Sequence, residues 1–162
     1  MIVSNIRTAE VSVVRQEFQE TVRLPGRRES VWATVSDIPA VLSWISIVGA
    51  AEEVDPGSRY RALLEDRMGP FKLRADLDIS VGERVEGALI RARGDGEDRQ
   101  IGSRLIIEVT LALSDDGDGT AVDVHGSYEV TGRPATLGAS SIRKKASKVL
   151  SEFFTSAERA LA

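Results

Sequence analysis

Hydrophobic and polar residues alternate along most of the chain, most regularly between Phe71 and Val81. In that segment every second position is apolar, and the positions between them are polar or charged. A period of two predicts a strand with one buried and one solvated face, because a shift by one residue would expose the whole apolar set. Less regular alternation predicts six more strands, at residues 14–24, 46–54, 59–67, 85–93, 101–113 and 122–130.

Short segments rich in Gly, Pro and Asp separate these strands and mark the turns. Pro25-Gly26 and Asp55-Pro56-Gly57 each combine a residue of fixed φ with one that accepts a positive φ. Residues 94–98 (GDGED) are expected to form a polar loop, and residues 115–120 (DDGDGT) a hairpin turn. Because consecutive strands joined by short turns pair antiparallel, the pattern predicts one antiparallel sheet of about seven strands.

Apolar residues recur at spacings of three and four in three places, which predicts helices. Two short helices follow the first strand, at residues 28–36 and 39–45. The third pattern runs from Arg133 to Ala162 and is expected to form one amphipathic helix about 35 to 40 Å long. Its apolar stripe consists of Leu137, Ile142, Ala146, Val149, Leu150, Phe153, Ala157 and Leu161.

The order of these elements defines the expected fold class. A strand, two short helices, six strands and a long helix correspond to an α+β domain, in which a curved antiparallel sheet wraps around the C-terminal helix. The space between the concave face and the helix is either packed solid or hollow. We assign residues 14–162 to this single domain and residues 1–13 to an N-terminal arm without predicted structure.

Composition narrows the possible functions. The chain has 162 residues, no Cys and one His, so we expect no disulfide, no metal cluster, no cysteine nucleophile and no cofactor. A net charge of −4 and a pI near 5.2 argue against nucleic acid as a partner. The N-terminus lacks a secretion signal, and no run reaches the ~18 to 20 apolar residues of a membrane span. A cytoplasmic protein is expected.

Four segments resemble a known family. They are residues 24–32 (LPGRRESVW) at the first strand-to-helix junction, residues 68–73 (MGPFKL) at a hairpin, residues 116–120 (DGDGT) before the last strand, and Leu137-Gly138 at the final helix. With the order of elements, they make residues 14–161 similar to the helix-grip fold of the START-like, polyketide cyclase (SRPBCC) superfamily. Within it, the chain most resembles the carbon monoxide dehydrogenase G-subunit family.

This resemblance implies a non-enzymatic accessory or carrier protein. It would hold a hydrophobic small molecule, lipid or quinone-like, in a cavity under the C-terminal helix. Its partner would be an oxidoreductase, a molybdenum hydroxylase of the carbon monoxide dehydrogenase type. The alternative is a small cyclase, dehydratase or hydrolase of the polyketide cyclase type that acts on an apolar or aromatic substrate. A structural domain with a filled core is a third interpretation.

A helix over a concave apolar sheet can enclose a mostly hydrophobic ligand cavity. Apolar stripes at structural spacing are also what a packed core requires, so each candidate lining residue has two interpretations. Among the candidates, Tyr60 and Arg91 would orient a polar group of the ligand. The full set is Trp32, Trp44, Tyr60, Phe71, Leu73, Leu77, Arg91, Leu105, Ile107, Ile142, Ala146 and Phe153.

Asp123, His125 and Ser127 are the residue types of a hydrolytic triad, and they occupy alternate positions of the last predicted strand. This spacing separates neighbours by about 7 Å, so we expect the three side chains to project into solvent beyond hydrogen-bond reach of one another. We therefore predict no catalytic residue.

Arg143, Lys144, Lys145 and Lys148 form a basic cluster on the predicted C-terminal helix. The simplest interpretation is a solvated helix face. The functional one is a surface for an acidic partner or for peripheral contact with an anionic membrane, where each basic residue contributes about 1 kcal/mol.

Overall fold

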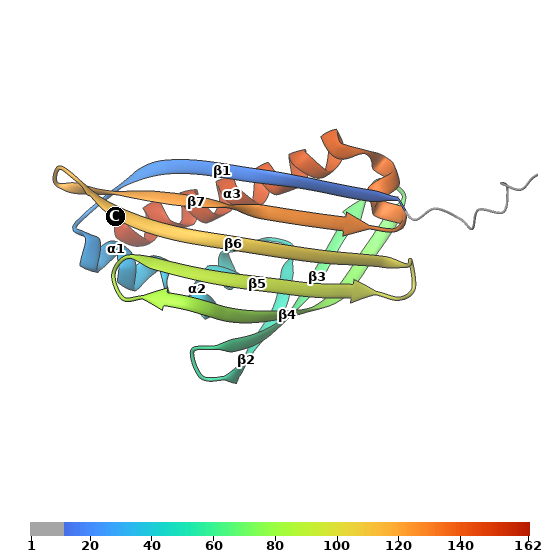
Figure 1. Cartoon of the computed structure of the whole chain (residues 1–162), viewed down its shortest axis with the longest axis horizontal. Helices are drawn as coiled ribbons and strands as arrows, with labels where there is room; N and C mark the ends of the chain where they lie inside the picture. The colour runs from blue at the N-terminus through green and yellow to red at the C-terminus, as the bar shows by residue number, and fades with distance from the viewer. Residues whose placement is uncertain (1–11) are drawn as a thin grey trace, which may run out of the picture.

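The computed structural model describes residues 12–162, which form a seven-stranded antiparallel sheet with the helices on one face (Figure 1). The strand order is β1-β7-β6-β5-β4-β3-β2. The predicted α+β helix-grip fold is therefore confirmed. The elements are β1 Val13–Pro25, α1 Arg28–Val35, α2 Ile38–Trp44, β2 Val48–Asp55, β3 Arg59–Met68, β4 Phe71–Val85, β5 Leu89–Asp98, β6 Ser103–Asp116, β7 Gly119–Thr131, the 3₁₀-helix η2 Arg133–Leu137 and α3 Ala139–Leu161.

Five hairpins connect β2 through β7 in sequence, while β1 pairs with β7, the last strand. The strands curve around the helices, and α3 lies diagonally behind the sheet in Figure 1. Residues 1–11 of the expected N-terminal arm (residues 1–13) lie outside the described residues. Val13 already belongs to β1, and the Ser12 carbonyl accepts a hydrogen bond from the Gly132 N–H.

Residues 94–98 are strand, not the expected polar loop, because neighbouring side chains lie over their two glycines. A Cβ at Gly94 would come within 2.8 Å of Ile107 Cγ2, and Cβ atoms at Gly94 and Gly96 would each lie 3.2 Å from Leu77 Cδ1. The buried Asp98 carboxylate accepts hydrogen bonds from the backbone N–H groups of Arg74 and of Gln100 in the following turn. These glycines allow large side chains of β4 and β6 to lie flat on β5.

The expected single helix over residues 133–162 is divided in two. Gly138 separates η2 from α3 with φ 91° and ψ 164°, a conformation that is essentially restricted to glycine. Leu137, the last residue of η2, lies over Gly69 at the β3–β4 turn, where a Cβ would be 2.9 Å from Leu137 Cδ2. The short helix thus covers one end of the sheet before α3 begins.

The buried apolar residues form three clusters instead of one continuous core. The first surrounds Trp32 and Phe153 at the α1 end, and the second joins Ile142 to Tyr128 at the η2 end. The third is a small group of Leu64, Ala75 and Leu77 on β3 and β4. In the described part of the chain, no helix is long and apolar enough to cross a membrane.

Candidate functional site

The middle of the concave face carries apolar side chains that pack against the buried clusters but are only half-buried. Inward-facing side chains toward the strand ends are buried, whereas several in the middle of the sheet are half-buried, as are apolar residues on the middle of α3. A solid core would remove them from solvent. We call this half-buried apolar surface, which faces α3, the chamber. Its half-buried walls are Leu73, Ile79, Leu105 and Ile107 on the strands and Ala146 and Val149 on α3.

Strand register arranges one inward-facing row across the chamber. The row runs from Tyr60 on β3, which lies opposite Glu53 on the edge strand β2, to Tyr128 on β7 and Gln16 on β1. At ~4.8 Å per strand, the two tyrosines lie about 19 Å apart along the curved sheet. The positions between them are Ile79, Gly94 and Ile107. The row therefore combines an apolar centre with a phenol toward each end.

Tyr128 forms the polar end of the chamber beside α3. Only 6% of the residue is exposed, and its hydroxyl donates a hydrogen bond to Gln16 Oε1. Burial raises the pKa of the phenol, with the nearby Arg143 charge acting in the opposite direction. Sequence reasoning missed this pair, because Tyr128 fits the apolar set of its strand. The detectable signal was Gln16, a polar residue at an inward position of β1.

Tyr60 occupies the other end, and 5% of it is exposed. Burial raises the pKa of its phenol, and the neighbouring Glu53 carboxylate raises it further. Tyr60 also lines a pocket of about 280 Å³ between α2 and β2. The predicted candidate Tyr60 is thus placed between the chamber and this pocket.

The two tryptophans differ in role. Trp32 is buried, donates its indole N–H to Glu86 Oε1 at 2.8 Å and stacks under the Arg84 guanidinium, so it joins α1 to the β4–β5 hairpin. Trp44 is half-buried on α2, with its ring centroid 6.0 Å from that of Phe153. Trp32 and Phe153 are core, and Trp44 lies at the margin of the chamber.

The remaining predicted candidates divide between wall and core. Leu73, Leu105, Ile107 and Ala146 are half-buried and line the chamber. Leu77 and Ile142 are buried members of the packed clusters, and Phe71 is half-buried at the start of β4.

The prediction that Arg91 lines the ligand cavity is corrected, because Arg91 lies outside the chamber. The turn between β4 and β5 falls after Val85, so Ile90 faces inward, with 6% of it exposed, and Arg91 faces outward. Its side chain is 59% exposed and pairs with Glu83 at 3.3 Å.

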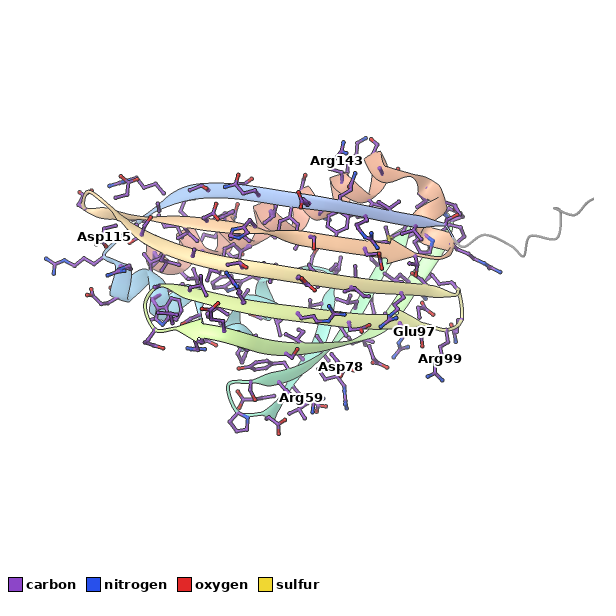
Figure 2. All side chains as sticks on the ribbon, in the orientation of Figure 1. Arg59, Asp78, Glu97, Arg99, Asp115 and Arg143 are labelled. Atoms are coloured by element: carbon purple, nitrogen blue, oxygen red, sulfur yellow. The ribbon has the colours of Figure 1, made fainter. Side chains whose placement is uncertain are left out.

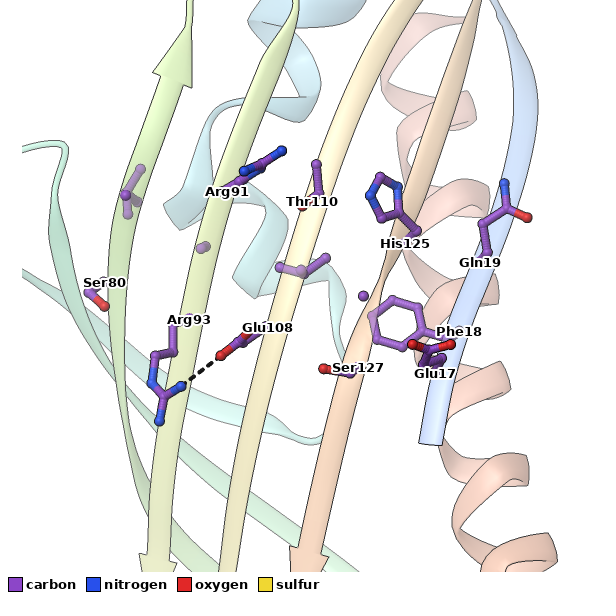
Figure 3. Close-up of a pocket in the computed structure, with 15 residues that line it drawn as sticks. Glu17, Phe18, Gln19, Ser80, Arg91, Arg93, Glu108, Thr110, His125 and Ser127 are labelled. Atoms are coloured by element: carbon purple, nitrogen blue, oxygen red, sulfur yellow. Dashed lines mark hydrogen bonds and ion pairs between the residues drawn. The ribbon is translucent and has the colours of Figure 1, made fainter. Parts of the chain in front are cut away.

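The outer face of the sheet carries a broad open trough of about 780 Å³, which no helix residue lines (Figure 3). Its walls are two rows of outward side chains, and its floor is the backbone between them. Charged groups here pair across strands, as Arg93 does with Glu108 at 2.8 Å. Across the whole face, paired charges project into solvent (Figure 2). The charged side chains that rim the trough are thus paired with one another.

Asp123 and His125 lie closer together than predicted. Oδ2 of Asp123 is 2.6 Å from Nδ1 of His125, because side chains two positions apart lean toward each other along β7. Burial alone would raise the pKa of the Asp123 carboxyl, but hydrogen bonds from Thr21, His125 and Gln19 hold it below its usual range. Ser127 makes no hydrogen bond to this pair among the described contacts, so the three residues do not form a triad.

The basic cluster on α3 divides into one paired lysine and three solvated residues. Lys145 pairs with Asp66 on β3 at 3.0 Å, which ties α3 to the sheet. Arg143, Lys144 and Lys148 are exposed, and Figure 2 shows Arg143 projecting from the first turns of α3.

Known proteins share this architecture. Residues 15–161 match the sequence profile of a family described as "Polyketide cyclase / dehydrase and lipid transport". No curated protein matches the chain. A conserved protein from Geobacillus kaustophilus is similar in structure, with a TM-score of 0.79 and 21% identity over 90% of this chain and 94% of that chain.

Two further solved structures agree in fold. A START superfamily protein from Mycobacterium smegmatis and a protein from Thermus thermophilus each give a TM-score of 0.66 and 18% identity, over 89% of this chain and 95% of theirs. At these identities, the likeness shows a shared fold.

Proposed function

The chain belongs to the polyketide cyclase / dehydrase and lipid transport family, and on that premise we propose that it is a non-enzymatic carrier of a hydrophobic small molecule. The observation that supports this proposal is the set of half-buried apolar side chains on the concave face of the sheet and on the facing side of α3. Apolar side chains that remain accessible to solvent cost free energy, at about 25 cal/mol per Å², and a bound apolar ligand would recover it. Leu105, Ile107 and Ala146 are such side chains.

The row across the chamber supports a neutral ligand. Its one charged residue is Glu53 at the β2 edge, and from Tyr60 to Gln16 it carries none. A charged head group would be left unpaired in the apolar centre. Both phenols are neutral at neutral pH, and burial raises the pKa of each above its ordinary value of 10.0. The Gln16 amide retains N–H groups that can donate to a carbonyl. A lipid or quinone-like molecule with a neutral oxygen-bearing head fits this chemistry.

The proposed partner is an oxidoreductase of the carbon monoxide dehydrogenase type, a molybdenum hydroxylase, in the cytoplasm or at the membrane surface. It is supported by the four sequence segments that resemble the G-subunit family. The exposed Arg143, Lys144 and Lys148 supply a positively charged surface on α3, opposite in sign to the acidic chain as a whole. That surface would contact an acidic partner or an anionic membrane.

The second candidate is a cyclase, dehydratase or hydrolase of the polyketide cyclase type. It is favoured by the family description and by Tyr128, whose phenol lies in the chamber and would act as a proton donor. In the carrier, Tyr128→Phe would weaken binding only modestly. In the enzyme, it would abolish turnover while binding remains.

Binding of N-phenyl-1-naphthylamine, a neutral apolar dye that fluoresces in apolar sites, tests the carrier proposal. Ile107→Trp fills the chamber and should abolish dye binding, since Ile107 is half-buried on the inward row. Ile106→Trp is the matched control, because Ile106 is its neighbour on the opposite face. Equal dye binding by both variants, or no lipophilic molecule in native mass spectra of the freshly purified protein together with no dye binding, would contradict the proposal.

A further inference from the structure

The pocket of about 280 Å³ between α2 and β2 lies at the edge of the sheet. Pro39 and Leu42 of α2 line one side, and Val48 and Ala51 of β2 line the other. At about 30 Å³ for each water molecule, this volume holds about nine heavy atoms. The pocket is therefore large enough for a small molecule with an apolar part.

Both walls of the pocket are held in place by local bonds. The Asp37 carboxylate caps α2 by accepting a hydrogen bond from the Ala40 N–H at 3.2 Å. Only residues 45–47 connect α2 to β2. The Ile47 carbonyl in this connection accepts a hydrogen bond from the Glu65 N–H of β3 at 2.8 Å. A connection this short keeps α2 beside β2, so the pocket is formed by the fold itself.

The charged groups of the pocket are acidic. Glu53 lies opposite Tyr60 in the β2–β3 pairing, and both residues line the pocket. Glu52 also borders it, although its carboxylate lies 3.9 Å from the Arg61 guanidinium. None of the described residues that line the pocket is basic. A bound cation would therefore meet a carboxylate without a competing positive charge in the lining.

Tyr60 adds a hydroxyl group to this acidic lining. Burial raises the pKa of its phenol, and the carboxylates of Glu53 and Asp37 raise it further, so negative charge surrounds it. Arg84 lowers this pKa, but its guanidinium is engaged by Glu86 at 3.5 Å. A neutral phenol can donate one hydrogen bond and accept another. Its oxygen is thus available as an acceptor for an N–H donor.

We propose that the pocket binds a small organic cation, a primary ammonium group on an apolar stem. The ammonium pairs with the Glu53 carboxylate and donates to the Tyr60 hydroxyl. The stem lies between Leu42 of α2 and Ala51 of β2. This inference is independent of the proposed carrier function, because a cation held at the β2 edge and a neutral ligand on the chamber occupy different surfaces.

Benzylammonium is a suitable probe, and benzyl alcohol is a neutral molecule of the same shape. In a titration followed by amide NMR spectra, benzylammonium should shift the backbone signals of Ala51 and Tyr60. Benzyl alcohol should bind about tenfold more weakly, because it lacks the charge that pairs with Glu53. Added salt should weaken the binding of benzylammonium and leave that of benzyl alcohol unchanged.

Two pairs of variants test the pocket. Glu53→Gln removes the charge and should weaken benzylammonium binding about tenfold, whereas Glu20→Gln, on exposed β1 outside the pocket, should leave it unchanged. Ala51→Phe fills the pocket and should abolish binding. Ala50→Phe places the same side chain on the adjacent exposed position, which does not line the pocket, and should preserve it. All four variants should keep the circular dichroism spectrum of the unmodified protein.

Three results would overturn the proposal. They are equal affinity for benzylammonium and benzyl alcohol, equal weakening by Glu53→Gln and Glu20→Gln, and amide shifts confined to residues away from α2 and β2. Binding of N-phenyl-1-naphthylamine by Ala51→Phe distinguishes this site from the carrier function. The variant should bind the dye as the unmodified protein does, so either proposal can fail while the other stands.

Discussion

Two tyrosines carry most of the polar chemistry of the interior, and the chain has no others. Tyr60 and Tyr128 lie on one row and face the same chamber, yet each has its own partner, Glu53 for the first and Gln16 for the second. Both hydroxyls are shielded enough for burial to raise their pKa above the ordinary 10.0. The interior therefore offers two neutral hydroxyl groups, those of Tyr60 and Tyr128.

Alkaline titration of the phenolate absorbance should therefore show two groups that both ionise above the range of free tyrosine. The unfolded chain loses these protons first, near pH 10, so the free energy of unfolding should decrease as the pH rises from about 10. Tyr60→Phe should remove one of the two transitions and leave the other unchanged. A transition at the ordinary value in the native protein would show that the corresponding phenol is solvated.

Gly94 has a separate structural role, because Ile107 and Leu77 occupy the space above it. Gly94→Ala should lower the free energy of unfolding by about 1 to 3 kcal/mol through overpacking. Gly82→Ala is the matched control on β4, where the nearest atom, the Arg91 carbonyl oxygen, would lie 3.8 Å from the new Cβ. Its effect should stay within about 0.5 kcal/mol, as measured by urea denaturation. Equal losses in the two variants would mean that strand propensity, not packing, is responsible.

At the scale of elements, alternation predicted all seven strands and the two short helices, because period and turn residues are local properties. The loop prediction for residues 94–98 was wrong because glycine and acidic residues usually mark loops, and the reason for them here, the side chains of Leu77 and Ile107, comes from other strands. The division of the last helix at Gly138 was missed for a similar reason. The apolar stripe continues through the break, and only the backbone conformation shows it.

The site was less predictable than the fold. The alternation placed Leu105 and Ile107 correctly on the inward face. It placed Leu89 and Arg91 on the wrong face, because the face of each β5 residue depends on where the β4–β5 turn falls, and the turn lies after Val85. Whether an inward apolar residue is core or wall depends on the distance to α3, which no local pattern encodes.

The helices also differ in how firmly they are held. α1 buries Val31, Trp32 and Val35, whereas α2 relies on its Asp37 cap, the Trp44–Phe153 contact and the Ser46 N–H bond to Glu152. Amide hydrogen exchange should therefore show α2 at least about tenfold less protected than α1, a difference of about 1.4 kcal/mol in opening free energy. Equal protection of α2 and α1 would show that the number of buried residues does not govern how readily each helix opens.

At the scale of the whole molecule, charge is distributed unevenly. The outer face of the sheet carries cross-strand ion pairs such as Arg104 with Asp95 and Arg61 with Asp78, while the first half of α3 presents Arg143, Lys144 and Lys148 to solvent. In an acidic protein, this makes α3 the side that an anionic surface would approach.

Changing Arg143, Lys144 and Lys148 together to Glu should reduce sedimentation with anionic phosphatidylglycerol vesicles, and the loss should be largest at low salt. The same charge change at Arg67, Lys72 and Arg74, which are exposed on β3 and β4, is the control. Dye binding should be unchanged in both variants. Identical vesicle binding by the two would exclude the α3 surface.

The pairing of β1 with β7 also governs how the protein folds. Gln16 and Tyr128 are 112 residues apart in sequence, yet they form one hydrogen bond at the edge of the chamber. While the ribosome is translating the chain, β1 has no partner until β7 has been made, and such non-local pairings form slowly. The five hairpins can assemble first, with the N-terminal strand and α3 added at the end. A nascent chain therefore lacks the surface between the sheet and α3, and a ligand of the proposed carrier would bind only after synthesis has passed α3.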